Sequence, residues 1–517
     1  MVDDCPRDTR GHGQAVLALG VDVGTTNTKV ALVAISAGEP GCGVVRVVTA
    51  AGAPTPDDAS TLVATAVGLV RSVLADAPRP PDVVGLASMA ETGVPIDADG
   101  EPLCPFLRWD GHRACAEAKA LAADLGRDAL FTTTGVRPSA KVPLATLAWL
   151  RRNEPDVWLR MRHWAGAADI VCLAMTSRLA TDHTLAGRTM AYRLPGPDGV
   201  LPATFDADLL AAVGLYPEQL PAIVGPREVA GRVTASAFVG AGLLAGTPVV
   251  VAGHDHAVGA YAAGVGAPGD VADSLGTAEA VITVLARSPE PAAVAAAGMS
   301  LVRTVTGQHE ALMAACGSAG AMIAWWLATM VGNRPAADVF ADVDRLPAGP
   351  TGVLVLPYLA GRQAPAPDPA AEVVIIGRTA GHGRAQLTRA LLEGLSLQAR
   401  WMLAEQARLG GTDLAGSEVA VLGGAVSANP TWMGVKAAVT PAPLRLVGIT
   451  QPVAAGAALV AAERAGLLAA GVVRLPGCRS SAAGARVRAG CSPGAAYDQM
   501  FREFVTAALA VNRNGEL

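Results

Sequence analysis

Two strand–turn–strand segments of similar design, one near the N-terminus and one in the middle of the chain, constrain the fold most. In residues 16–33, two runs rich in apolar, β-branched residues are joined by Gly-Thr-Thr-Asn-Thr, which predicts a hairpin with a loop longer than two residues. Residues 269–284 repeat this plan, because Asp273 precedes a Gly276-Thr277 turn and an apolar strand follows. A repeat this far along the chain predicts two related halves, each presenting a Gly-Thr turn to one ligand.

The residues of the first turn suit a phosphate group. Gly24 lets backbone amides approach a phosphate closely. The hydroxyls of Thr25 and Thr26 can donate hydrogen bonds, and Lys29 adds a positive charge. Asp22, on the strand before the turn, could hold a magnesium ion through a bridging water. An ordinary polar hairpin is the alternative for this loop alone, and the second Gly-Thr turn weighs against it.

Two phosphate-facing turns from opposed domains suit a nucleotide clamped in a cleft. A third glycine turn, Gly423-Gly424-Ala425, follows a predicted strand and could lie against the adenosine, although Gly-Gly after a strand is also common as a plain turn. The chain contains no Gly-Lys-Ser/Thr, so a P-loop is excluded. Residues 264–269 match the dinucleotide fingerprint only formally, because they follow a predicted helix rather than a strand.

Asp255 stands where an apolar strand runs into a small-residue helix. Its carboxylate could cap the helix by accepting free amides of the first turn. It could also act as a general base at a strand end beside a domain cleft, and the nucleotide-binding turns favour this second interpretation. The flanking His254 and His256 could be metal ligands, but no third ligand is evident nearby, so magnesium bound with a nucleotide is the better-supported ion.

Composition limits the classes of protein to consider. The chain has 517 residues, of which 51% are hydrophobic. One compact core cannot accommodate so many hydrophobic residues, so we predict two large domains. A net charge of -5, a sequence pI near 5.9 and only four lysines argue against a nucleic-acid partner. The eight cysteines form no Cys-x-x-Cys pair, and residues 1–14 are polar and acidic rather than a signal peptide, so we expect a cytoplasmic protein.

Residues 311–332 carry no charge and are long enough to span a bilayer. A single membrane-spanning helix in the middle of an α/β pattern is not consistent with the topology that the rest of the chain predicts. We therefore expect no membrane partner, and we predict that this segment is a buried helix with a glycine-rich entry.

The first hairpin, the Asp255 junction and the two later glycine turns, in this order, resemble the FGGY family of carbohydrate kinases. The resemblance extends over about residues 16 to 470, with further matching segments at residues 84–100, 105–113, 181–189, 356–361 and 377–394. The chain departs from family patterns at three places: Thr146 replaces a lysine, residues 361–365 read Gly-Arg-Gln-Ala-Pro, and Gln451 replaces a glutamate.

The resemblance implies an α/β fold of two actin-like (ribonuclease H-like) domains with a cleft between them. Residues 15–253 would form the N-terminal domain with the sugar side and the phosphate hairpin, and residues 254–470 the C-terminal domain on the ATP side. Residues 471–517 would be a tail, ending in an amphipathic helix at 495–512 that is expected to pack back on the N-terminal domain.

The resemblance also implies roles for single residues. His256 would contact a substrate hydroxyl, and Glu91 occupies a sugar-contacting position, although a solvated loop acid is its alternative. Trp109 could form an apolar floor for the sugar carbons or be an ordinary core residue, with Asp110 and Arg113 as an ion pair behind it. On the nucleotide side, the γ-phosphate would face Gly24, Thr25 and Thr26, the β- and γ-phosphates Gly276 and Thr277, and the adenosine Gly423, Gly424 and Ala425.

The predicted function is ATP-dependent phosphorylation of a sugar (ketose) or polyol hydroxyl, with Asp255 as general base and Mg-ATP bound between the domains. The alternatives are an actin-like ATPase that acts on proteins, as a chaperone or filament does, and an inactive sugar-sensing relative. The sequence leaves open which sugar is used, which carbon is phosphorylated and the oligomeric state, for which a homodimer is one expectation.

Overall fold

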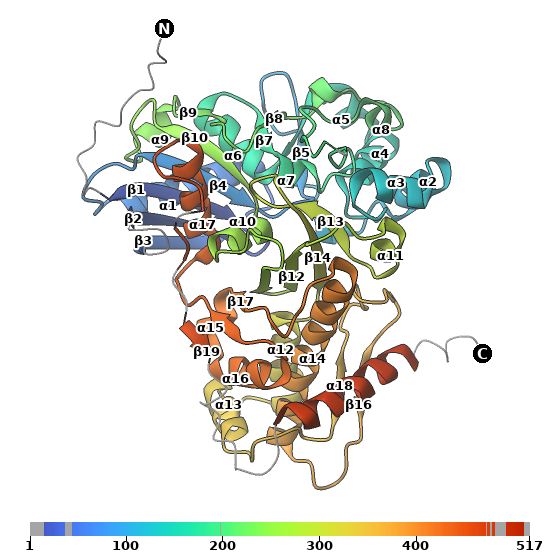
Figure 1. The fold of residues 1–517 in the computed structure, drawn as a ribbon. Coiled ribbons are helices and arrows are strands. Elements are labelled where there is room, and N and C mark those ends of the chain that lie inside the picture. Colours follow the sequence, from blue (N-terminus) through green and yellow to red (C-terminus); the bar gives the residue numbers. More distant parts are fainter. Residues whose placement is uncertain are drawn as a thin grey trace.

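A computed structural model describes residues 15–36, 44–196, 198–471, 473–475, 478–480 and 493–510. These residues form two α/β lobes, each built around a mixed β-sheet (Figure 1). In each sheet an antiparallel hairpin lies beside a parallel strand: β1 and β2 beside β4, and β11 and β12 beside β17. The two halves predicted from the repeated Gly-Thr turns therefore share one topology.

The first sheet has the strand order β3-β2-β1-β4-β10-β9. Strands β1, β4 and β10 run parallel, so their carboxyl ends meet at one edge of the sheet, where ligands of open α/β sheets bind. The strands of this sheet are β1 Val16–Val23, β2 Asn27–Ser36, β3 Val44–Pro54, β4 Val83–Ser88, β9 Gly231–Arg232 and β10 Pro248–His254.

Helices cover both faces of this sheet, which explains why all of β1 is buried. Because side chains alternate along a strand, Leu17, Leu19 and Val21 join the core formed with α1 (Ala59–Leu74) and α6 (Ala167–Thr176). Val16 and Ala18 face the opposite side, in a core that contains residues of α17 (Pro452–Arg464).

Helix α17 comes late in the chain but packs on strands β1 and β4 of the first sheet. The contact is close because its sheet-facing positions are alanines and the strands carry glycines. A Cβ on Gly20 would lie 1.7 Å from the carbonyl oxygen of Ala454, and one on Gly85 would lie 2.0 Å from that of Ala457. Only glycine fits at either strand position.

Small elements fill the rest of the first lobe. A separate apolar cluster with Leu147, Leu150 and Phe205 holds several of them together. They are β5 Gly93–Ile96, the 3₁₀ turn Trp109–Gly111, α2 Cys115–Asp124, α3 Arg127–Thr134, α4 Pro143–Asn153, α5 Pro155–Arg160, β6 His163–Gly166, β7 Ala180–Asp182, α7 His183–Ala186, α8 Ala207–Ala211, the 3₁₀ turn Pro217–Gln219, β8 Ala222–Val224 and α9 Ser236–Val239.

The second sheet has the order β13-β14-β12-β11-β17-β18-β19. Its strands are β11 Val271–Leu275, β12 Glu279–Val284, β13 Ser300–Arg303, β14 Glu310–Cys316, β17 Val419–Leu422, β18 Leu444–Leu446 and β19 Cys478–Ser480. The helices that accompany it are α10 Asp255–Ala262, α11 Pro291–Ala296, α12 Gly320–Trp326, α13 Ala336–Asp344, α14 Arg384–Gly410, α15 Gly424–Ala428 and α16 Pro430–Val439, and a further hairpin pairs β15 Leu354–Pro357 with β16 Val373–Ile376.

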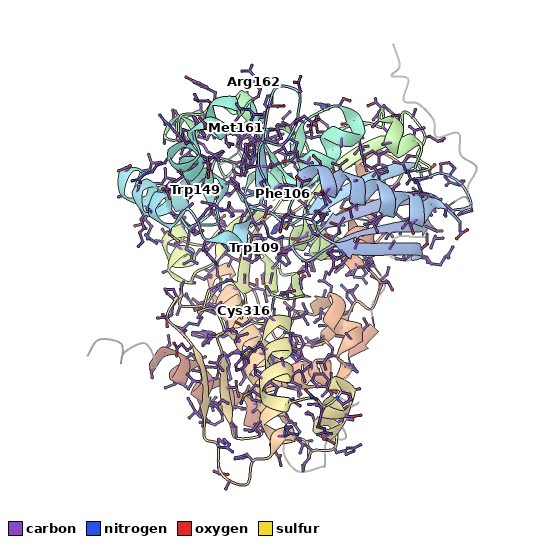
Figure 2. All side chains as sticks on the ribbon, turned by 180° about the vertical axis from the view of Figure 1, so that it is seen from behind. Phe106, Trp109, Trp149, Met161, Arg162 and Cys316 are labelled. Carbon is purple, nitrogen blue, oxygen red and sulfur yellow. The ribbon has the colours of Figure 1, made fainter. Side chains whose placement is uncertain are left out.

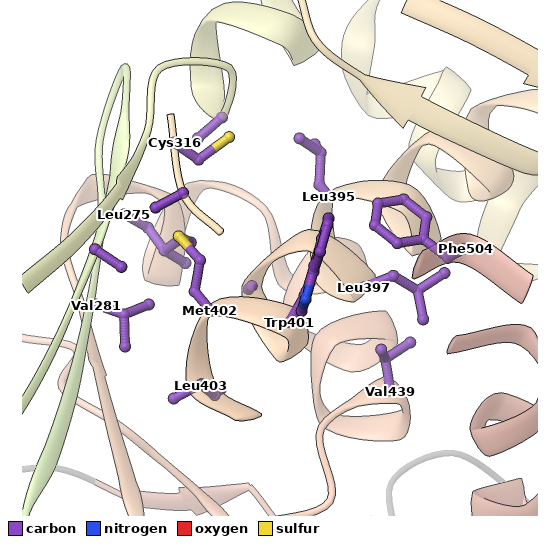
Figure 3. Packing of buried hydrophobic residues seen from close by; sticks show 14 of the residues in the cluster. Leu275, Val281, Cys316, Leu395, Leu397, Trp401, Met402, Leu403, Val439 and Phe504 are labelled. Atoms are coloured by element: carbon purple, nitrogen blue, oxygen red, sulfur yellow. The ribbon is translucent and has the colours of Figure 1, made fainter. Parts of the chain in front are cut away.

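The 27-residue helix α14 forms the centre of the second lobe's core. Figure 3 shows Met402 of this helix facing Leu275 and Val281 of the sheet, while Leu397 lies toward Phe504 of the last helix. That helix, α18 (Pro493–Ala510), packs on α14, α16 and β15. The expectation that it packs on the N-terminal domain is therefore wrong, because its apolar face completes the core of the second lobe.

The segment 311–332 is not the single buried helix that its hydropathy predicted. It consists of strand β14, a glycine turn, helix α12 and a π-helical turn Leu327–Val331. Trp326 is buried, whereas Trp325 is 36% exposed. None of the helices in the described ranges combines the length and hydropathy that a membrane crossing requires.

Candidate active site

A pocket of about 640 Å³, part of it open to solvent, lies between the two lobes. Trp109 lies at the edge of the first lobe that faces the second, in which Cys316 is found (Figure 2). The pocket is lined by Thr25, Glu91, Trp109, Lys141, Arg188 and His254 of the first lobe, by Asp255 and His256 at the start of α10, and by residues of the second lobe that include Ala278, Glu279, Gly317 and Gln363.

The backbone before Asp255 is shaped to aim this residue into the pocket. The pairing of β10 with β4 shifts register between Val251 and Gly253, and such bulges re-aim side chains beside active sites. Gly253 has a φ of 128°, and a Cβ there would lie 2.3 Å from the Thr184 hydroxyl oxygen. That hydroxyl accepts the backbone N–H of His254 at 2.8 Å and donates to a carboxylate oxygen of Asp182 at 2.6 Å. Gly253 and Thr184 thus hold the strand end in place.

Asp255 is the first residue of α10, and its side-chain exposure is 20%. Its Oδ1 accepts the backbone N–H of His256 at 2.7 Å and lies 3.1 Å from Nε2 of His254. The N-cap residue of the helix is His254, whose side chain makes no capping hydrogen bond. Burial raises the pKa of the Asp255 carboxyl, and nearby His256 opposes this. The carboxylate therefore satisfies one amide of the first helical turn while it lines the pocket.

The two histidines beside Asp255 differ in their surroundings. His254 is buried, which lowers the pKa of its imidazole well below the usual value, so it is neutral at physiological pH. A neutral imidazole can donate from Nε2 to the Asp255 carboxylate and orient it. The ligand atoms of His254, Asp255 and His256 lie within 4.8 Å of one another. Nε2 of His254 also lies 3.1 Å from Oδ1 of Asp255, so the imidazole and the carboxylate are in direct contact.

Asp22 lies near Asp255, at the same edge of the first sheet. It is 4% exposed, and its Oδ1 finds no hydrogen-bond partner in the described part of the chain. Lys29 lies 3.9 Å from the other carboxylate oxygen. Burial, followed by the charge of Asp255, raises the pKa of Asp22 to about 7. A buried carboxylate with a free oxygen beside a second carboxylate fits a divalent cation, since Mg²⁺ prefers oxygen ligands of this kind.

The first predicted phosphate turn borders the pocket. Its backbone is closed by a hydrogen bond from the Gly24 N–H to the carbonyl of Asn27 at 3.1 Å. Thr25 lines the pocket, and its hydroxyl oxygen accepts the indole N–H of Trp109 at 3.1 Å. Thr26 is exposed. The turn therefore contacts the Trp109 side chain through Thr25 and leaves the Thr26 side chain exposed.

The second and third glycine turns lie side by side. Strands β11 and β17 are parallel neighbours, so Gly276-Thr277 and Gly423-Gly424-Ala425 follow adjacent strand ends. A Cβ on Gly423 would lie 2.0 Å from the carbonyl oxygen of Leu275. Gly276, Thr277 and Gly424 are exposed. The second turn continues into Ala278 and Glu279, which line the pocket opposite Thr25.

Asp273 resembles Asp22 in sequence but not in its surroundings. It is fully buried 2.7 Å from Lys436, whose Nζ also donates to Glu279 at 2.5 Å. Both carboxylates raise the pKa of Lys436 against the effect of burial. Burial and the neighbouring Asp273 raise the pKa of Glu279 to about 8 although Lys436 opposes them. Asp273 thus pairs closely with a fully buried cation, whereas Lys29 lies 3.9 Å from Asp22 and is partly exposed.

Glu91 lies at the end of the pocket formed by the first lobe. Its φ is 64°, a conformation uncommon for a non-glycine residue, and such strain concentrates at functional sites. Arg188 donates to its Oε1 at 2.5 Å, and Lys141 lies 3.9 Å from its Oε2. Burial would raise the pKa of Glu91, but Arg188 and Lys141 outweigh it and hold the pKa below the usual range. Glu91, whose side chain is 9% exposed, is therefore an anion held by two cations, and a solvated loop acid is excluded.

Lys141 and Arg188 line the pocket without having been assigned a site role from the sequence, and His254, which also lines it, was considered only as a possible metal ligand. Arg188 lies in a segment that resembles the FGGY family. Its ion pair with Glu91 depends on the tertiary fold and could not be predicted from the sequence. The prediction of an ion pair between Asp110 and Arg113 is wrong. Asp110 pairs with Arg108 at 3.1 Å, and Arg113 lies over the Trp149 ring instead.

Comparison with known proteins identifies two family domains in this chain. Residues 17–262 match the N-terminal domain of the FGGY family of carbohydrate kinases, and residues 271–465 match its C-terminal domain. The chain is 23% identical to a gluconokinase of Bacillus subtilis (strain 168) over 397 residues, covering 73% of this chain and 74% of that protein. It is 29% identical to a glycerol kinase of Alkalilimnicola ehrlichii over 398 residues, covering 74% and 76%.

Solved structures show the same two-lobed fold. The crystal structure of xylulose kinase from Rhodospirillum rubrum superimposes with a TM-score of 0.79 at 26% identity, covering 96% of this chain and 99% of that one. The crystal structure of gluconate kinase from Lactobacillus acidophilus gives a TM-score of 0.80 at 19% identity, covering 96% and 98%, and is similar in fold.

Proposed function

This chain belongs to the FGGY family of carbohydrate kinases, which phosphorylate a sugar or polyol with ATP, and from that premise we propose that Asp255 is the general base of the transfer. The observation that carries the proposal is the place of its carboxylate, which lines the interlobe pocket together with Glu91 and His256. The raised pKa brings this base closer to the working pH, as general catalysis requires.

In the proposed step the substrate hydroxyl donates its proton to the Asp255 carboxylate while its oxygen bonds to the γ-phosphorus of ATP. The bond from that phosphorus to the oxygen bridging the β- and γ-phosphates breaks, and ADP leaves with both electrons of the bond. His254 orients the carboxylate from one side, and the His256 amide holds it from the other. Asp255 then releases its proton to solvent with the product.

We assign the triphosphate to the two Gly-Thr turns. Gly24, Thr25 and Thr26 would donate to the γ-phosphate with Lys29 nearby, and Gly276 and Thr277 would face the β- and γ-phosphates. The adenosine would lie against Gly423, Gly424 and Ala425, which the parallel β11 and β17 place beside the second turn. Asp22 would hold Mg²⁺ through a bridging water, and the bound ion would offset the negative charge of the phosphates.

We assign the hydroxylated substrate to the pocket end at Glu91. Glu91 and His256 would contact hydroxyl groups, and the Trp109 ring would cover the carbon chain. A ketose or a polyol fits these groups, and relatives described as xylulose kinase and glycerol kinase support these two classes of substrate. A protein-directed ATPase would have no use for this pocket, and the presence of Asp22 and Asp255 argues against an inactive sensor.

The test is ADP release by the purified protein with Mg-ATP, alone and with a panel of ketoses, aldoses, polyols and sugar acids. We expect at least one carbohydrate to stimulate turnover strongly over the rate with ATP alone. Equal, low turnover in every sample would overturn the proposal, and stimulation by a protein substrate would support the ATPase alternative.

A further inference from the structure

The end of the pocket around Glu91 holds more positive than negative charge. Glu91 faces two cations, because Arg188 and Lys141 both approach its carboxylate. Of the other carboxylates that line the pocket, Glu279 is bound by Lys436, and Asp255 contacts His254 and the His256 amide rather than Lys141 or Arg188. The neutral His254 adds no charge, although Arg188 and Lys141 lie close enough to lower its pKa further. One positive charge is therefore left over at this end.

Arg188 and Lys141, the two cations beside Glu91, also have unused hydrogen-bond donors. Arg188 is 4% exposed, yet its Nε and Nη1 have no hydrogen-bond partner among the described residues. A buried guanidinium with unpaired N–H groups is costly, so a ligand that supplies acceptor oxygens is expected there. Lys141 lies 3.9 Å from Glu91, which is too far for a hydrogen bond, and its side chain is one-third exposed toward the pocket. Both residues can therefore donate to a substrate.

We propose that the substrate is a polyhydroxy acid whose carboxylate binds between Lys141 and Arg188 while one of its hydroxyls reaches Asp255. This inference rests on the proposed function, since it concerns the same pocket. A carboxylate carries one negative charge and matches the surplus of one positive charge. A phosphate monoester carries about 1.5 to 2 negative charges at neutral pH and would exceed it. The Trp109 ring, 5.9 Å from the Lys141 ammonium, lies beside this binding position.

The experiment compares matched pairs of probes that share a carbon chain and differ in a terminal carboxylate: D-gluconate with D-glucitol, and D-xylonate with xylitol. ADP release gives kcat and KM for each probe with the wild type, Lys141→Met, Lys141→Arg and Lys119→Met. Lys119 is exposed on α2 and outside the pocket, so it provides a matched control for removing a lysine.

We expect kcat/KM for the acid to exceed that for its matched polyol by about tenfold or more, as one charge-assisted contact allows. Lys141→Met should lower this ratio about tenfold, mainly through a higher KM for the acid. Lys141→Arg should keep most of the preference, and Lys119→Met should keep all of it. Melting temperatures of the four proteins show whether each variant is folded.

A preference for the polyols, for neutral ketoses or for sugar phosphates would overturn the inference and leave the proposed kinase function standing. An unchanged ratio in Lys141→Met would also overturn it. If no carbohydrate of any class stimulates ADP release, the proposed function itself fails, and this inference fails with it.

Discussion

Asp255 shows how neighbouring groups adapt a single carboxylate for proton transfer. The register shift before Gly253 aims it into the pocket, and contacts with His254 and the His256 amide limit its rotation. Burial raises its pKa, so the ionised carboxylate is a stronger base than an exposed aspartate. The helix-cap and general-base interpretations are compatible, because one oxygen can accept an amide while the carboxylate lines the pocket.

Replacing Asp255 by Asn should lower kcat by about 100-fold or more, because the amide cannot accept the hydroxyl proton. Stability should hardly change, since the Asn oxygen can still accept the His256 N–H and the cost of a buried charge disappears. Turnover and thermal melting of Asp255→Asn and of the exposed control Asp99→Asn provide the check. Full activity with a lowered melting temperature would mean that the residue only caps the helix.

The pH dependence of kcat/KM follows from the raised pKa of Asp255. A raised pKa means that the carboxylate takes up its proton at a higher pH than an exposed aspartate, so activity should fall as pH falls through that value. The midpoint of the acidic limb should therefore lie above about 3.9, the reference value for aspartate. Initial rates at subsaturating carbohydrate and saturating Mg-ATP measure it. A flat profile down to about pH 4 would contradict the assignment.

At the scale of secondary-structure elements, the contact of α17 with β1 and β4 fixes the strand that carries Asp22 and the strand that ends shortly before Glu91. Gly20 and Gly85 let the alanine-rich helix approach the sheet within van der Waals contact. Forming this close packing costs little side-chain conformational entropy, because alanine has no side-chain rotamers to lose. A change in this layer is therefore expected to affect both stability and the pocket.

Gly20→Ala should lower the free energy of unfolding by about 3 kcal/mol, because the new methyl group overlaps the Ala454 carbonyl. Gly68→Ala is the matched control. Gly68 lies on the exposed side of α1, and a methyl group there would have no atom within 4 Å, so the same change should stabilise by about 0.5–1 kcal/mol. Urea denaturation of both variants measures the difference, and equal effects would contradict this account of the packing.

At the scale of the whole molecule, a single guanidinium joins segments from both halves of the chain. Arg464 at the end of α17 donates to a carboxylate oxygen of Asp182 at 2.9 Å and to the carbonyls of Val251 and Val305 at 2.9 and 3.0 Å. Asp182 in turn binds Thr184, which holds the His254 amide. The strand end that carries Asp255 is thus coupled to the packing between the lobes.

Arg464→Met should lower the free energy of unfolding by about 3–5 kcal/mol, because it removes the guanidinium that pairs with the buried Asp182 carboxylate. It should also lower kcat, since the strand end before Asp255 loses support. Arg502→Met, on the exposed face of α18, is the control and should change neither quantity. Denaturation and turnover are measured on both proteins. A melting temperature equal to that of the wild type would show that the network does not hold the lobes.

Much of the architecture could be predicted from local sequence. The alternating apolar runs around Gly24-Thr25 and Gly276-Thr277 predicted two hairpins, and the run before Asp255 predicted a strand leading into a helix. These features are confirmed because strand periodicity and turn chemistry depend on neighbouring residues. The order of the motifs was also enough to indicate the family. The roles of the site residues stay predictions until activity is measured.

The tertiary structure alone decided which distant residues meet. Lys141 and Arg188 reach Glu91, Lys436 pairs with Asp273, and α18 completes the second lobe rather than the first. Local pattern cannot specify such contacts, because they join residues far apart in the chain that become neighbours only when whole layers pack. Burial in those layers then sets the pKa values and leaves the Arg188 donors unpaired, so the chemistry of the pocket follows from packing.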